Sequence, residues 1–267
     1  MIFFFNSLFV RSLDESIGRV EKSSFSQQTL MELLVSKFEG RTVFLTRDGA
    51  FADISQWLNV TVNDFQEVTH IDWDGRQLFH REGGTIDMHW LPDTVQTFKI
   101  AHRNVHGTID TFDLPRGLLE FSTRSNPLSG TFDVSGLPRG MASLVIGISN
   151  LSGSFDLTAL PPTLTFCAAY QSDFSGTLDF SQLPEPLEYL NLSGNHFSGE
   201  IDLSELPLAL ASLIIHTNEF LQDELRIGNK LRCRCTMDRN TIERIVNTDG
   251  VEVQPQRGDH GLLELLC

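Results

Sequence analysis

The sequence is poor in cysteine and in basic residues. Its 267 residues include four cysteines, and no two of them form a CxxC pair. Four irregularly spaced cysteines are too few for a disulfide-scaffolded secreted module, and the missing CxxC argues against a zinc site. Lys and Arg total 20 against 35 Asp and Glu, a formal net charge of −15. This excess of acid argues against nucleic acid as a partner.

Long apolar runs are scarce as well. Residues 1–10, MIFFFNSLFV, have the length of the apolar part of a signal peptide, but no basic residue precedes them and no clear small-residue cleavage site follows. No other stretch approaches the ~18–20 apolar residues of a membrane span. We therefore expect no membrane span and favour an intracellular, cytoplasmic location, with secretion or the cell surface as the alternative.

Motifs of catalysis and cofactor binding are missing too. The chain has no GxSxG, no P-loop and no GxGxxG, and although His102 and His106 are spaced as HxxxH, we interpret its five histidines between residues 70 and 106 as ordinary surface residues. We therefore expect no enzyme activity, no catalytic residues, no cofactor and no metal site.

What the sequence does contain is an internal repeat of 23 residues, which decides the architecture before any local propensity does. The dipeptide Leu-Pro recurs at this interval from Leu91-Pro92 to Leu206-Pro207. A glycine and an aspartate keep the same phase, from Gly84 to Gly199 and from Asp87 to Asp202.

The clearest copy is LEYLNLSGNHFSGEIDLSELP, residues 187–207. Its first half has leucines at 187, 190 and 192, then Asn195 and Phe197, which is the spacing of a leucine-rich repeat. The chain thus resembles the leucine-rich-repeat family. Its SGxID continuation is similar to the plant-type subclass (LxxLxLxxNxFSGxIDLSxLP), although Asp replaces the usual Pro and the unit is one residue shorter.

The resemblance implies an α/β-type leucine-rich-repeat solenoid. This fold is a right-handed curved stack with a parallel β-sheet on its concave face and short 3-10 or turn segments on its convex side. Laid over all copies, the motif predicts eight strands, each with two inward residues. These pairs are Ile71/Trp73, Phe98/Ile100, Phe121/Thr123, Leu144/Ile146, Cys167/Ala169, Leu190/Leu192, Leu213/Ile215 and Cys235/Met237.

The polar columns of the repeat have structural interpretations. Each column aspartate precedes a short turn segment, where a carboxylate commonly caps backbone N–H groups, and we favour this role over metal binding. The asparagine column begins with Arg76 and Arg103 instead of Asn. Because Arg has no acceptor atom for an inward turn, we expect the first two turns to be solvated or distorted.

Three domains follow from these patterns. Residues 1–67 form an N-terminal segment, with a cap helix at about 26–38 that starts at Ser26; residues 68–242 form the solenoid of about eight repeats; and residues 243–267 form a C-terminal cap with a closing strand. We expect Cys233 and Cys235, two apart on a strand, to be buried or free thiols.

The variable positions beside the inward residues point outward from the concave sheet, the face that usually binds a macromolecule in this family. The middle copies place aromatic and aliphatic side chains there, the composition of an interface core. The candidate binding residues are Val145, Ile148, Phe166, Tyr170, Tyr189, Asn191 and Ile214. We predict a non-enzymatic scaffold that binds a protein or peptide on this face; the alternative is a secreted or surface ectodomain for recognition or adhesion.

Overall fold

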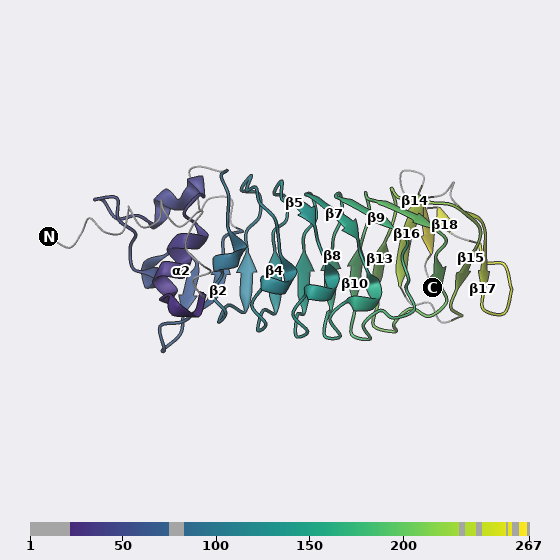
Figure 1. Ribbon diagram of the computed structural model, residues 1–267. Coiled ribbons are helices and arrows are strands. Elements are labelled where there is room, and N and C mark those ends of the chain that lie inside the picture. Colours follow the sequence, from purple (N-terminus) through teal and green to yellow (C-terminus); the bar gives the residue numbers. More distant parts are fainter. Residues whose placement is uncertain are drawn as a thin grey trace.

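The computed structural model describes residues 22–74, 83–229, 233–238, 242–254, 256–257 and 262–265. These residues form an elongated solenoid with the N-terminal helical region at one end and the last strands at the other (Figure 1). The apolar stretch 1–10, Arg76 and Cys267 lie outside the described residues. Within the described ranges, no helix has the length and apolar composition needed to cross a membrane.

The N-terminal region contains a short α-helix, α2 (Gln27–Leu34), whose N-cap is Ser26 as predicted. Leu30, Met31, Leu33 and Leu34 are its buried face. The helix is shorter than the predicted 26–38 because Phe38 is extended and forms an antiparallel bridge with Gly84, which ties the region to the first repeat. Three 3-10 helices complete the region: η1 (Lys22–Ser24), η2 (Glu39–Phe44) and η3 (Ile54–Gln56).

The main sheet has 11 strands and runs the length of the solenoid. Eight of them are parallel and confirm the eight predicted strands: β2 (Val68–Asp72), β3 (Thr97–Lys99), β4 (Glu120–Ser122), β6 (Ser143–Val145), β8 (Phe166–Ala168), β10 (Tyr189–Asn191), β13 (Ser212–Ile214) and β16 (Arg234–Asp238). Antiparallel strands cover both edges: β1 (Val60–Val62) beside β2, and β19 (Leu262–Leu265) with β18 (Gln256–Arg257) beside β16. Covered edges leave less unpaired backbone for aggregation.

The register of the main sheet stacks equivalent residues of successive repeats. Leu190, for example, pairs with Cys167 on one side and Leu213 on the other. All eight predicted inward pairs are at most 2% exposed and form one continuous core. Burying one such leucine stabilises the fold by about 1.5–3 kcal/mol. Burial also raises the pKa of the Cys167 thiol to about 12.

A second parallel sheet, which the sequence did not predict, is formed by the SGx segments of the repeats. Its strands are β5 (Ser129–Thr131), β7 (Asn150–Ser154), β9 (Asp173–Gly176), β11 (His196–Gly199) and β14 (Glu219–Phe220). The column glycine is required here: Gly153 has φ +102°, and a Cβ would lie 2.8 Å from Cγ2 of Thr131 in the preceding repeat. The glycine thus permits both the conformation and the close approach of strands.

The column aspartates cap the next segment of each repeat, as predicted. Four of the segments are 3-10 helices: η4 (Met88–Trp90), η5 (Thr111–Asp113), η6 (Val134–Gly136) and η7 (Leu157–Ala159). In the third, Oδ1 of Asp133 accepts hydrogen bonds from the backbone N–H (2.9 Å) and hydroxyl (2.7 Å) of Ser135. Both bonds lower the pKa of Asp133, and the bond from the Ser135 hydroxyl has the larger effect. The role of the column is therefore structural.

The prediction for the Arg103 turn was wrong. Arg103 is fully buried, its backbone N–H donates to Oδ1 of Asn126 in the next repeat (3.0 Å), and its Nε donates to the carbonyl of Trp73 (3.3 Å). The side chain therefore lies inside the solenoid and bonds to backbone carbonyls instead of reaching water.

The C-terminal part adds a third, parallel sheet of β12 (Asp202–Leu203), β15 (Gln222–Ile227) and β17 (Ile242–Asn247). Cys233 and Cys235 are buried, as expected. β19 closes the main sheet by pairing antiparallel with β16.

Candidate functional site

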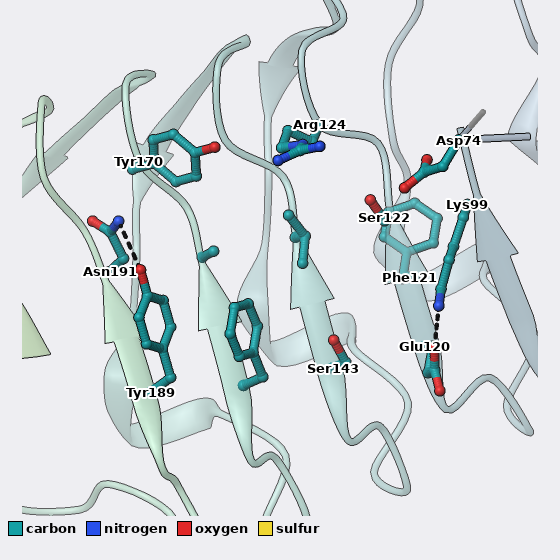
Figure 2. A pocket seen from close by; sticks show the side chains of 13 residues that line it. Asp74, Lys99, Glu120, Phe121, Ser122, Arg124, Ser143, Tyr170, Tyr189 and Asn191 are labelled. Carbon is teal, nitrogen blue, oxygen red and sulfur yellow. Dashed lines mark hydrogen bonds and ion pairs between the residues drawn. The ribbon is translucent and has the colours of Figure 1, made fainter. Parts of the chain in front are cut away.

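A shallow groove of about 420 Å³ crosses the outer face of the main sheet. Alternation along each short strand places one residue inward and its neighbours outward, so Leu190 enters the core while Tyr189 and Asn191 face the groove. Figure 2 shows side chains from successive strands arranged along the groove, aromatic at one end and charged at the other.

The aromatic end is built by β8, β10 and the turns that follow β6 and β8. The rings of Phe166 and Tyr189 are stacked, with centroids 4.5 Å apart and planes inclined by 5°. Nδ2 of Asn191 donates to the Tyr189 hydroxyl oxygen (3.2 Å) and fixes it. Phe166 is 38% exposed, which is high for a large aromatic side chain and leaves its ring available to a ligand.

Tyr170 is held against the backbone of the neighbouring repeat. A Cβ at Gly147 would lie 2.6 Å from Cδ1 of Tyr170 and 2.7 Å from its carbonyl oxygen, so the ring occupies the space that a side chain there would fill. Its hydroxyl points toward Arg124 (Figure 2). The two tyrosines of the whole sequence, Tyr170 and Tyr189, thus both line this groove.

The charged end is built by the first repeats. Lys99 and Glu120 form an ion pair with 2.6 Å between Nζ and Oε2, and the hydrogen bond to Glu120 raises the pKa of Lys99. Asp74 and Arg124 complete this end. Burial, followed by the repulsion of Asp72, raises the pKa of Asp74, although Arg124, Lys99 and His102 partly oppose this.

The structure brings five of the seven candidate residues together. Val145, Phe166, Tyr170, Tyr189 and Asn191 all line the groove.

Ile148 and Ile214 lie outside the groove. Ile214 is on β13, one strand beyond Asn191. Ile148 is 41% exposed and has φ +58°, a conformation that is strained for a β-branched residue.

Sequence reasoning did not select the charged lining residues Asp74, Lys99, Glu120 and Arg124. Lys99, Glu120 and Arg124 are at outward positions of the repeat, so the register could have placed them on this face. The sequence does not show where this face is hollowed into a groove, because that depends on how side chains of different size lie together in three dimensions.

Metal binding finds no support in the described residues, among which no three His, Cys, Asp or Glu side chains converge on a metal-sized site. The nearest approach to such a cluster is His196 on the second sheet, whose Nδ1 lies 2.8 Å from Oε1 of Glu219 and whose Nε2 lies 4.0 Å from Oδ1 of Asp173.

No protein-family model matches the chain, and no curated protein matches it in sequence. Among solved structures, the chain is similar to the leucine-rich-repeat ectodomain of the Arabidopsis thaliana membrane receptor kinase GASSHO1/SCHENGEN3, solved in complex with CASPARIAN STRIP INTEGRITY FACTOR 2. The TM-score is 0.52 at 16% identity, over 80% of this chain and 30% of that one.

Two further solved structures are similar at a TM-score of 0.49 each. They are the BIR3–SERK2 complex of Arabidopsis thaliana (17% identity, 66% of this chain and 96% of that one) and the plant peptide hormone receptor RGFR1 in complex with RGF2 (18% identity, 68% and 29%). The 23-residue repeat, the stacked register of its strands and the likeness to the first ectodomain together establish that this chain has the leucine-rich-repeat solenoid fold.

Proposed function

We propose that the chain is a non-enzymatic binding module whose concave sheet face holds an extended peptide segment of a protein ligand. The observation that carries the proposal is the groove, which places the exposed Phe166–Tyr189 stack beside hydrogen-bonding and charged groups. Aromatic anchors surrounded by polar groups are the composition of binding hot spots. An open groove across parallel strands fits an elongated ligand better than a compact small molecule, which needs deeper enclosure.

The held side chains also favour binding over a purely structural role. Asn191 fixes the Tyr189 hydroxyl, and the Gly147 backbone supports the Tyr170 ring. Side chains that are ordered before binding lose less conformational entropy when a ligand arrives. In an extended peptide, alternate side chains would face the sheet and contact these anchors.

The test uses a displayed library of random dodecapeptides, selected on the purified chain. Enriched peptides are synthesised, and their affinities are measured by fluorescence anisotropy for the wild type, Phe166→Asp and Tyr170→Asp. Phe112→Asp is the matched control, because Phe112 is a 63% exposed phenylalanine on the 3-10 helix η5, outside the groove.

We expect Phe166→Asp and Tyr170→Asp to weaken binding at least tenfold, because each places a charge at an apolar contact. Phe112→Asp should bind like the wild type, and all three variants should keep a cooperative melt. The proposal is refuted if the library yields no enriched peptide, or if the groove variants bind as tightly as the control.

A further inference from the structure

The carboxyl group of Asp74 is incompletely satisfied. It lines the charged end of the groove, where Figure 2 shows it beside Lys99. Its Oδ1 atom is buried and accepts no hydrogen bond from any described residue. A buried carboxylate oxygen without a donor is unusual in a folded protein, and such a group attracts a cation that can compensate its charge.

The neighbouring charges leave this end of the groove acidic. Lys99 already forms an ion pair with Glu120. Asp72 and Asp74 also lie near this lysine, so three carboxylates stand against two strong bases, Lys99 and Arg124, and neither aspartate forms an ion pair with Arg124 in the described structure. Arg116, Arg124 and Arg139 are the basic residues of positions 105–225, against 15 acidic ones, so the surrounding repeats add a negative field. Such a field draws cationic ligands toward the surface.

The sheet sets the distance between the two ends of the groove. Asp74 follows β2, and Phe166 lies on β8, four strands away in the order β2-β3-β4-β6-β8. Neighbouring strands are about 4.8 Å apart, so the ends are separated by about 19 Å. An extended peptide advances about 3.3 Å per residue and spans this distance in about six residues.

We infer that the ligand of this groove is a basic peptide, in which a Lys or Arg side chain pairs with Asp74 while an apolar side chain about six residues away contacts Phe166 and Tyr189. This inference rests on the proposed function and adds the chemistry and spacing of the ligand. Asp74 is its specificity-determining residue, and because Oδ1 is buried, the cation pairs with the carboxyl group through the side that lines the groove.

The experiment extends the library selection to a double-mutant cycle. A synthetic dodecapeptide enriched on the wild type is compared with its Lys→norleucine form, which keeps the four side-chain carbons and removes the ammonium group. Both peptides are measured against the wild type and Asp74→Asn. Glu188→Gln is the matched control, because it removes one exposed carboxylate just before β10 that does not line the groove.

Enrichment of Lys or Arg five to seven positions from an aromatic or aliphatic residue supports the inference. The wild type should then lose about tenfold in affinity when Lys becomes norleucine, as expected for a charged hydrogen bond. Asp74→Asn should bind the Lys peptide about tenfold more weakly than the wild type does. Replacing Lys by norleucine should not weaken its binding further. Glu188→Gln should behave like the wild type.

The contrary outcomes separate the two proposals. Peptides that depend on Phe166 but carry no enriched base, or carry Asp or Glu instead, overturn the inference and leave the peptide-binding function standing. Equal losses on Lys→norleucine in the wild type and Asp74→Asn also overturn it, because the cation then binds elsewhere. A library without any enriched peptide overturns both.

Discussion

Removal of the Asn195 side chain should destabilise the solenoid more than removal of any exposed asparagine. Asn195 is 5% exposed and links its own repeat to the preceding one. Its Nδ2 donates to the carbonyls of Ala169 (2.8 Å) and Leu192 (3.0 Å), and its Oδ1 accepts from the N–H of Phe174 (3.2 Å). The substitution Asn195→Ala deletes all of these bonds at once.

The magnitude follows from the groups left without a partner. The Leu192 carbonyl keeps a second donor, Nδ2 of Asn218, at 3.0 Å. The carbonyl of Ala169 and the N–H of Phe174 lose the side-chain partner described above. Each buried backbone group without a partner costs about 1–3 kcal/mol, so Asn195→Ala should lower the free energy of unfolding by about 2–6 kcal/mol.

The chain supplies its own intermediate case at Ser149, the equivalent position two repeats earlier. Its hydroxyl donates to the Ile146 carbonyl (3.0 Å), three residues before it, as Asn195 does to Leu192. Asn195→Ser should therefore keep the local bond, lose the bonds to the preceding repeat, and cost less than Asn195→Ala. Asn150→Ala, at an exposed position of β7, is the control and should stay within about 0.5 kcal/mol of the wild type.

Urea unfolding followed by circular dichroism measures these differences, and hydrogen exchange of the Phe174 amide reports the lost bond directly. A loss below 1 kcal/mol for Asn195→Ala, with the Phe174 amide still protected, would refute the view that the asparagine column holds the repeats together. Equal stabilities of the Ser and Ala variants would refute the role assigned to Ser149.

Three other predictions concern the strained, capping and titrating residues. Ile148→Gly should raise the free energy of unfolding by about 0.5–1 kcal/mol in urea, because it relieves the left-handed φ of +58° that Gly194 adopts without strain in a later repeat; a net loss would contradict this. Asp156→Ala should lose about 1 kcal/mol because Asp156 caps η7, whereas Asp156→Asn should be nearly neutral and calcium should leave the melting temperature of the wild type unchanged; a calcium-dependent melt would revive a metal role. Asp74→Asn should melt higher than the wild type at pH 7, because the fold raises the pKa of Asp74 and disfavours its ionised form; the difference should disappear as the pH falls below the ordinary value of 3.8, where both states hold the proton. A constant difference across this range would contradict the assignment.

The repeat period predicted the main sheet almost completely, because every inward position must bury an apolar side chain between neighbouring repeats. A single repeat cannot bury its own apolar face, so residues such as Leu190 and Cys167 must stack in register. The second sheet was missed for the opposite reason. Its segments are short and contain glycine and serine, which have low strand propensity, and they pair because the main sheet already places them one strand spacing apart.

The Arg103 turn shows where residue-type reasoning fails. Arginine was expected to reach water, but the asparagine of the next repeat holds its backbone N–H, and carbonyls of the first repeats accept its guanidinium. These partners come from other repeats, so the spacing within one copy does not reveal them. The same holds for the groove, whose hollow depends on Tyr170 lying over the bare Gly147 of the neighbouring repeat.

Two departures from local rules lie on the outer face of the main sheet. They are the incompletely satisfied Asp74 and the exposed Phe166, whereas the left-handed φ of Ile148 recurs at the equivalent position of other repeats, from His102 to Thr217. Features that reduce stability persist where another requirement opposes them, and in proteins they cluster at binding sites. The inward residues and the recurring Asn, Asp and Gly positions stabilise the stack, so the outward positions are free to vary. This difference between stabilising and variable positions favours a ligand on the outer face of the main sheet. On the convex side, aspartates such as Asp133 already cap backbone N–H groups.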